Sequence, residues 1–314
     1  MNCPKVSVCI PTYNFAGYLP EAIESVLNQT FTNYELLIID DCSTDGTDAV
    51  VKNYLQADNR ITYKVNQHNI GMVNNWNLCL ADARGEYIKF LFGDDLLASN
   101  RALEQMVAAL DMDPSVSLVG SSRDLINADS RKIGKFSKLG KDAVVHGLDM
   151  INRCLREQKN LIGEPSAVMF RKKDASRGFK PYYKQLVDLE MWFHLLEQGN
   201  FAFISDSLAC FRQHSNQQTA INKHSMSALK DYYYLLDEYL VKPYVRISPF
   251  VINYNYYDIL YKIWKIRDKC EISRHQAVQE INDRFGLLKF FLYYPFYKAL
   301  KPVLRFYWKC INLN

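Results

Sequence analysis

The 314-residue sequence lacks any run of about 18 uncharged apolar residues, and no apolar segment precedes its first motif near residue 6. We therefore expect neither a membrane-spanning helix nor a signal peptide. Its eight cysteines are scattered, with no Cys-x-x-Cys pair and no histidine at metal-ligand spacing, which argues against a zinc site and favours reduced thiols. These absences together predict a cytoplasmic location.

Two phosphate-binding motifs are also absent. The turn at residues 11–17 lacks the G-x-G-x-x-G spacing of dinucleotide-binding dehydrogenases, and the pattern G-x-x-x-x-G-K-[ST] occurs nowhere in the sequence. Hydride transfer and P-loop hydrolysis are therefore disfavoured. A net charge of only +4 gives no reason to expect a nucleic-acid partner.

The sequence does have the composition of an ordinary globular protein, with 48% apolar and 23% charged residues. Short apolar runs alternate with segments of helical periodicity over roughly the first 90 residues, which predicts an α/β fold with an open, mostly parallel sheet flanked by helices. We expect strands at 6–10, 35–39, 61–65, 87–92, 116–121, 166–170 and 201–204, with helices that include 100–110 and 186–197.

From about residue 225 the sequence changes to Tyr-rich helical segments without a convincing strand. We expect a domain boundary near residue 222, with an α/β domain over 1–222 and a helical C-terminal region over 223–314. Residues 284–314 contain six Lys or Arg and no acid, interleaved with aromatic residues. Such a tail either lies in a membrane interface or packs on the protein with a solvated basic face, and its amphipathic pattern favours neither.

Polar residues follow each of the first four predicted strands, at the edge of a parallel sheet where ligands bind. Asp94 and Asp95 come after the fourth strand. Either one suits a helix cap, but two adjacent carboxylates repel each other unless a cation offsets the repulsion. Carboxylates suit Mg²⁺ or Mn²⁺, which are commonly bound by one or two of them together with substrate phosphates. We therefore predict a divalent metal ion beside a diphosphate.

Five ordered motifs resemble those of family 2 glycosyltransferases with the GT-A fold, over roughly residues 5–220. They are VSVCIPTYN at 6–14, LIIDDCSTDGT at 37–47, Asn69-Ile-Gly71 with Asn77, GEYI at 85–88, and Asp94-Asp95. The resemblance implies a Rossmann-like domain that binds a nucleotide sugar. It also implies inverting transfer of a sugar, from a UDP- or dTDP-sugar to a hydroxyl of a saccharide or lipid-linked saccharide acceptor, in the synthesis of a surface polysaccharide.

The resemblance also implies how the donor would be bound. Asp41 would accept a hydrogen bond from the base, Asp94 would face the ribose and the sugar, and Asp95 would bind the metal directly. Many members carry a third acid where this chain has Phe92, so Asp95 should supply most of the protein's coordination. The other residues implied to bind the nucleotide sugar are Pro11, Thr12, Tyr13, Asn69, Gly71 and Asn77.

Further residues are implied for catalysis and for the acceptor. Asp188, at the start of a predicted helix, matches the family's catalytic base, and Glu190 is the rival, about 200° away around the helix. The structural alternative is that Asp188 only favours the positive end of the helix dipole. His214 would approach the metal or the diphosphate, with support from Arg212. Glu164 would bind sugar hydroxyls of the acceptor.

Two other functions stay open. A sugar-phosphate nucleotidyltransferase shares the general sheet, but it would normally carry a glycine-rich, basic loop after the first strand, which this sequence lacks. A glycan-binding module with a degenerate site is the alternative from another class. Binding of a nucleotide sugar without turnover would favour the module.

Overall fold

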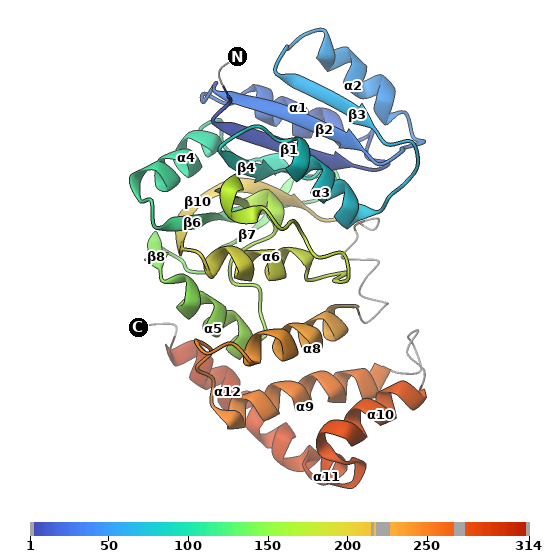
Figure 1. Ribbon diagram of the computed structural model, residues 1–314, viewed down its shortest axis with the longest axis vertical. Coiled ribbons are helices and arrows are strands. Elements are labelled where there is room, and N and C mark those ends of the chain that lie inside the picture. Colours follow the sequence, from blue (N-terminus) through green and yellow to red (C-terminus); the bar gives the residue numbers. More distant parts are fainter. Residues whose placement is uncertain (1–2, 215–216, 218–226, 267–273, 312–314) are drawn as a thin grey trace. The chain divides into compact units, whose positions relative to one another are not determined.

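The computed structural model describes residues 3–214, 217, 227–266 and 274–311, and Figure 1 shows the arrangement of its helices and strands. The chain forms two compact units. The first comprises Met1–Ile151, Asn160–Tyr183 and Val187–His214, and the second comprises Asn152–Lys159, Lys184–Leu186 and Ser215–Asn314. The boundary expected near residue 222 lies outside the described residues.

A single sheet forms the centre of the first unit. Its strands are β1 (Val6–Thr12), β2 (Tyr34–Asp40), β3 (Ile61–Val65), β4 (Tyr87–Phe90), β5 (Leu96–Leu97), β6 (Val116–Ile126), β7 (Lys132–Phe136), β8 (Ala143–Val145), β9 (Val168–Arg171) and β10 (Asn200–Arg212). Their order is β3-β2-β1-β4-β9-β6-β10-β5, with β7 beside β6 and β8 beside β10. Strands β3, β2, β1 and β4 are parallel, as are β6 and β10, whereas β9 runs antiparallel between β4 and β6. The predicted α/β class is confirmed, with a mixed sheet.

The helices of the first unit bury apolar faces that were visible in the sequence. In the first helix, Leu19, Ala22, Ile23 and Val26 recur at helical spacing and are all fully buried. Strands β1 and β2 are buried along their whole length, as expected of parallel strands in the middle of a covered sheet. The helices are α1 (Leu19–Leu27), α2 (Thr47–Leu55), α3 (Met72–Asp82), α4 (Ala102–Met112) and α6 (Val187–Leu196), with 3-10 turns η1 (Pro165–Ala167) and η2 (Lys172–Ala175). Helix α5 (Gly147–Glu157) begins in the first unit and ends in the second.

Several elements differ from the expectation. Strand β7 is mostly exposed, and its sequence KIGKF contains no apolar run from which a strand could be predicted. Strand β10 extends over 13 residues, far beyond the expected 201–204, because its second half continues to pair with β6 as far as Ile126. That extension carries the chain to the edge of the sheet where β1 and β2 end.

Gly85 precedes β4 where the chain passes close to β1. A Cβ atom there would lie 2.7 Å from the carbonyl carbon of Val6 and nearer still to the backbone nitrogen of Ser7. We expect Gly85→Ala to lower the free energy of unfolding by about 1–3 kcal/mol because the added methyl meets backbone. Gly17→Ala is the matched control, since nothing lies within 4 Å of a Cβ at that position. Thermal unfolding of both variants measures the effect, and equal melting temperatures would contradict it.

Helices make up the second unit as far as it is described. They are α8 (Ser227–Leu240), α9 (Pro249–Ile266), α10 (Arg274–Phe285), α11 (Leu287–Leu292) and α12 (Tyr294–Ile311). Tyrosines build much of its core: the ring of Tyr257 on α9 stacks on Phe290 of α11, and Tyr297 of α12 donates a hydrogen bond to Asp258. No helix within the described ranges is both long and apolar enough to cross a membrane.

Candidate functional site

The carboxyl ends of β1, β2 and β4 meet at one edge of the sheet, and the predicted donor residues lie along it. Pro11 and Thr12 end β1, and the Asp41 N–H donates to the Thr12 carbonyl at 2.9 Å. Gly93, just before the acidic pair, lies against the same residue, since a Cβ at Gly93 would be 3.2 Å from Thr12 Oγ1. The structure therefore brings Thr12, Asp41 and the pair at 94–95 to one edge.

Asp41 orders the loop that follows β3. Its carboxylate accepts hydrogen bonds from Asn66 Nδ2 (2.9 Å) and from the backbone N–H groups of Ile70 (2.8 Å) and Gly71 (2.9 Å). Gly71 has a φ of +86°, which a glycine adopts without strain. Three donors leave one lone-pair site of the carboxylate available, so Asp41 shapes the loop and retains the capacity to accept from a base.

The other residues predicted to bind the nucleotide sugar have different surroundings. Tyr13 is 46% exposed, and Asn69 Oδ1 accepts a hydrogen bond from the Gly71 N–H at 3.1 Å. Asn77 is engaged by one partner through both polar atoms: its Nδ2 donates to the Phe179 carbonyl (2.9 Å) and its Oδ1 accepts from the Phe179 N–H (2.7 Å). Asn77 thus fixes the segment that leads toward α6.

Residues far apart in the chain converge on the acidic pair. Arg212, at the end of β10, is fully buried, and it donates from its backbone N–H to Asp95 Oδ1 (3.0 Å) and from Nε to the Asp94 carbonyl (2.7 Å). His214 Nε2 lies 3.0 Å from Asp94 Oδ2. The Arg212 guanidinium also pairs with Glu21 at 3.2 Å. Arg212 therefore contacts both acids, and it holds the chain in place two residues before His214.

Asp95 has the least compensated charge of the pair. It is 1% exposed, and its Oδ2 has no hydrogen-bond partner among the described residues. Burial and then the charge of Asp94 raise the pKa of Asp95 well above its usual range, and the hydrogen bond from the Arg212 N–H opposes that rise. A buried carboxylate oxygen beside a second carboxylate fits a cation. Within the described ranges no three His, Cys, Asp or Glu are grouped to hold a metal, so the protein would supply only part of a coordination shell.

Turn η1 links the acidic pair to the predicted acceptor side. Lys89 of β4 is fully buried, and its Nζ donates to the carbonyls of Ser166 and Val168, while burial lowers the pKa of Lys89 to about 7. Glu164, just before η1, forms a two-pronged ion pair with Arg123 of β6 at 2.7 and 2.6 Å. The sequence interpretation missed Lys89 and Arg123. Lys89 is a charged residue within an apolar strand, which was the available signal, whereas Arg123 stands in the polar stretch Ser-Ser-Arg-Asp and gave none.

Asp188 lies in the first turn of α6 and is 9% exposed. Asn160 Nδ2 donates to Asp188 Oδ2 at 3.2 Å and also to the Gly163 carbonyl at 3.1 Å. Burial and then the negative charge of Glu164 raise the pKa of Asp188 to about 7, and Arg123 opposes that rise. A carboxylate with a near-neutral pKa is well matched to accept a proton. Ser166, two residues after Glu164, accepts a hydrogen bond from the Phe92 N–H at 3.1 Å, so the segment 160–166 contacts both Asp188 and the strand end that carries the acidic pair.

The rival acid, Glu190, is occupied by cations. It is 1% exposed, and both of its carboxylate oxygens lie 2.8 Å from Arg177 Nη2. Lys180 Nζ lies 3.1 Å from one of them. These ion pairs favour Asp188 over Glu190 as the group available for proton transfer.

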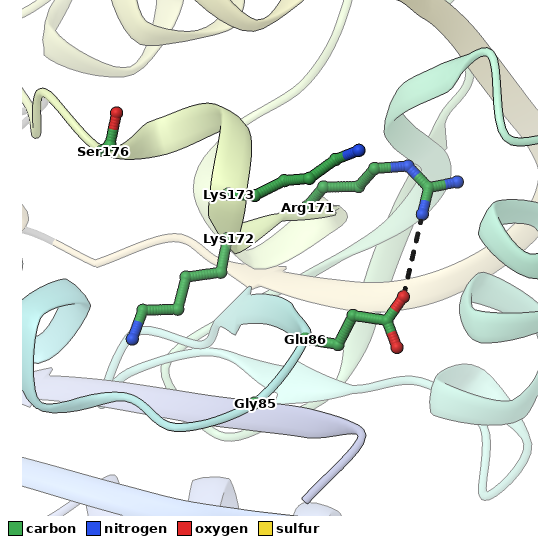
Figure 2. Close-up of a pocket in the computed structure, with 6 residues that line it drawn as sticks. All are labelled: Gly85, Glu86, Arg171, Lys172, Lys173 and Ser176. Atoms are coloured by element: carbon green, nitrogen blue, oxygen red, sulfur yellow. Dashed lines mark ion pairs between the residues drawn. The ribbon is translucent and has the colours of Figure 1, made fainter. Parts of the chain in front are cut away.

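A cavity of about 460 Å³ lies at the opposite edge of the sheet, near the amino end of β4. Figure 2 shows that it is lined by Gly85, Glu86, Arg171, Lys172, Lys173 and Ser176. Two of its cations serve the fold, because Arg171 Nε donates to the Val116 carbonyl (2.7 Å) and Lys172 Nζ donates to the Ala83 carbonyl. The cavity does not include the acidic pair or Asp188.

The family model described as "Glycosyl transferase family 2" matches residues 7–179, more than half of the chain. The chain belongs to glycosyl transferase family 2. This glycosyltransferase is 32% identical over 227 residues to the uncharacterized protein MT1568 of Mycobacterium tuberculosis, covering 69% of each chain. It is 28% identical over 249 residues to the Escherichia coli UDP-Glc:alpha-D-GlcNAc-diphosphoundecaprenol beta-1,3-glucosyltransferase WfgD, covering 79% of this chain and 91% of that one. It is also 28% identical over 236 residues to a putative teichuronic acid biosynthesis glycosyltransferase, TuaG, of Bacillus subtilis, covering 75% and 88%.

Solved structures show the same fold. The S. aureus TarS fragment in complex with UDP-GlcNAc superposes with a TM-score of 0.65 at 20% identity, covering 88% of this glycosyltransferase and 79% of that chain. The mannosyltransferase PcManGT of Pyrobaculum calidifontis, in complex with GDP-Man and Mn²⁺, gives a TM-score of 0.59 at 17% identity, covering 98% and 84%. The predictions of a GT-A fold and of an enzyme of the glycosyltransferase class are confirmed.

Proposed function

We propose that this glycosyltransferase moves a sugar from a UDP- or dTDP-sugar to a hydroxyl of a saccharide or lipid-linked saccharide, with inversion at the anomeric carbon. The observation that carries the proposal is that the segment 160–166 contacts both acidic sites. Asn160 Nδ2 donates to Asp188 Oδ2 at 3.2 Å, and Ser166 Oγ accepts from the Phe92 N–H, two residues before Asp94, at 3.1 Å. Asp95 has the uncompensated oxygen that suits a cation next to a diphosphate. Asp188 has the near-neutral pKa that suits removal of a proton from an acceptor hydroxyl.

The donor would bind along the edge formed by β1, β2 and β4. The base would donate a hydrogen bond to the remaining lone pair of Asp41, and Asp94 would face the ribose and the sugar. The name of the E. coli relative specifies UDP-Glc and the S. aureus structure contains UDP-GlcNAc, which supports a uracil base here. The proposed donor pocket is completed by Pro11, Thr12, Tyr13, Asn69, Gly71 and Asn77.

The residues present fit a divalent metal ion. Asp95 would be the direct ligand through its unpaired Oδ2, and His214, which now lies against Asp94, would approach the metal or the diphosphate. A bound Mn²⁺ or Mg²⁺ would stabilise, as a Lewis acid, the charge that develops on the leaving diphosphate. The Mn²⁺ in the P. calidifontis structure supports this assignment.

The transfer would be a single displacement. The acceptor oxygen forms a bond to the anomeric carbon as the bond to the diphosphate oxygen breaks, and Asp188 takes the hydroxyl proton. Asn160 holds Asp188 Oδ2, which orients the carboxylate for that proton. Glu164, whose side chain is 30% exposed, would bind acceptor hydroxyls, while Arg212 supports the acidic pair and the diphosphate.

We propose a lipid-linked acceptor, with the reaction at the inner face of the plasma membrane and peripheral contact between protein and lipid. The E. coli relative is named for a diphosphoundecaprenol-linked acceptor, and the B. subtilis relative for teichuronic acid biosynthesis. The nucleotidyltransferase alternative has less support, because the loop at 11–17 after β1 contains no Lys or Arg.

A thermal-shift panel of nucleotide sugars, with and without Mn²⁺, tests the donor class. A ligand at 100 times its Kd stabilises the folded state by about 2.7 kcal/mol, so the correct donor should raise the melting temperature clearly. We expect the rise with UDP- or dTDP-sugars in the presence of Mn²⁺, followed by slow hydrolysis of the same donor. Binding without any turnover would favour a glycan-binding or nucleotide-sugar-binding module instead.

The pH dependence follows from the surroundings of Asp188. The base must be ionised to act, so kcat/KM should fall as the pH drops through about 7, the pKa of Asp188 in the free enzyme. Glu164→Gln removes the negative charge that raises this pKa, so the acid limb of the profile should move to lower pH. Glu86→Gln, at the opposite edge of the sheet, is the matched control. An unmoved acid limb in the Glu164 variant would show that another group controls it.

A further inference from the structure

We propose that α11 and residues 294–303 of α12 form a docking face for a membrane surface that carries anionic phospholipid. The membrane face comprises six exposed apolar residues and two exposed lysines. They are Leu288, Phe291, Leu292, Tyr293, Phe296 and Val303, with Lys289 and Lys298. The inference deepens the proposed function, because it names the surface that would contact the membrane in which a lipid-linked acceptor lies. It rests on the proposed function only for the existence of that acceptor.

The spacing places the apolar side chains on continuous helix faces. Leu288, Phe291 and Leu292 follow an i, i+3, i+4 pattern along α11. Phe296 and Val303 lie seven residues apart, which is two turns of α12. Leu288 is 78% exposed and Phe296 is 67% exposed, so these large side chains are turned outward.

The opposite sides of both helices already bind the protein. Phe290 is fully buried: its ring stacks 4.5 Å from that of Tyr257, and its carbonyl accepts a hydrogen bond from Tyr257 Oη at 2.8 Å. Tyr297 is 6% exposed and donates to Asp258 on α9. Packing within this unit therefore accounts for one side of each helix and leaves an apolar side outward. A helix that merely packed with a solvated face would carry polar residues at those outward positions.

Charge identifies the occupant of this face. Lys289 and Lys298 are exposed beside the apolar residues, and residues 284–314 contain no acid at all. A second protein copy would bring the same positive charge to the contact. Anionic phospholipid headgroups supply the opposite charge, and the acyl boundary below them accepts Leu and Phe side chains.

Vesicle flotation with the full chain tests the proposal. The wild-type protein should bind vesicles that contain phosphatidylglycerol, and bind vesicles of phosphatidylcholine alone less well. The triple variant Leu288→Ser, Leu292→Ser, Phe296→Ser should bind at least about tenfold more weakly because it removes the inserting side chains. The control variant Met112→Ser, Val241→Ser changes side chains that are 84% and 81% exposed elsewhere, and it should bind like the wild type.

A second variant keeps the test independent of folding. Lys289→Glu with Lys298→Glu leaves the apolar residues in place, and it should weaken binding to phosphatidylglycerol vesicles roughly tenfold or more. Added salt should weaken wild-type binding in the same direction. Thermal stabilisation by the nucleotide sugar should persist in both variants. A loss of vesicle binding alone would therefore concern the membrane face and not the proposed transferase function.

Three results would overturn the proposal. One is a wild-type protein that does not bind the anionic vesicles. Another is a triple variant with wild-type binding. The third is a wild-type dimer in sedimentation equilibrium that the triple variant converts to a monomer, because the face would then be an interface between two copies.

Discussion

Asp188→Asn should abolish sugar transfer while leaving donor binding intact. Removal of a general base typically costs about 100- to 10,000-fold in rate, and the amide cannot take the acceptor proton. The substitution is nearly isosteric, and Asn160 and the helix N-terminus can still contact its oxygen. The proposed donor site lies along the edge with Asp41 and Asp95, so metal-dependent donor affinity should stay within about twofold of the wild type, as expected for a base that acts on the acceptor.

The matched control for this variant is Asp149→Asn. Asp149 is also in the first turn of a helix, but its side chain is 80% exposed and lies outside the site. Steady-state transfer rates and calorimetry with the donor give both readouts. Near-normal turnover of Asp188→Asn would refute the assignment of the base, and a combined loss of turnover and melting temperature would instead indicate a structural role at the helix dipole.

Asp95→Asn should abolish metal-dependent donor binding. Even outer-shell partners of a metal affect its affinity 10- to 100-fold, so loss of the direct ligand should cost about 100-fold or more. The Asn oxygen can still accept the hydrogen bond from the Arg212 N–H, which keeps the local backbone in place. Calorimetric titration of the donor, with and without Mn²⁺, measures the effect.

The melting temperature of the metal-free protein distinguishes a metal ligand from a structural carboxylate at position 95. Burial and Asp94 disfavour the ionised form of Asp95 in the metal-free protein. Replacing it with a neutral amide should therefore leave the metal-free melting temperature unchanged or raise it, while the stabilisation by Mn²⁺ and donor disappears. A clear fall in the metal-free melting temperature would contradict the metal assignment, and Asp149→Asn again serves as the control.

The first three parallel strands, β1, β2 and β3, could be predicted from the sequence because their signals are local. Strand β3 occupies the expected residues 61–65, and β1 and β2 extend the expected runs by one or two residues at their ends. The apolar runs of β1 and β2 end at Pro11 and at Asp40-Asp41, so the identity and the approximate limits of these two strands are visible in the sequence. Strands β7 and β8 gave no such signal, because they are short, largely exposed and held by pairing with β6 and β10.

The convergence of Thr12, Asp41 and the acidic pair on one edge could be predicted for the same reason, since each strand end is marked in the sequence and parallel strands end together. The contacts around Asp188 could not be predicted, because they join residues without a motif. Asn160 reaches Asp188 across 28 positions, and Arg123 reaches Glu164 across 41. Only the fold sets these distances, and with them the pKa of Asp188.

The anomeric configuration of the product tests the central claim most directly. The purified full chain would be supplied with an α-configured UDP-sugar that stabilises it, with Mn²⁺ and with a diphosphoundecaprenol-linked saccharide, and the new linkage would be read by NMR. Single displacement assisted by Asp188 predicts a β-linked product in the lipid fraction. An α-linked product, or a donor that stays bound without transfer to any acceptor, would contradict it.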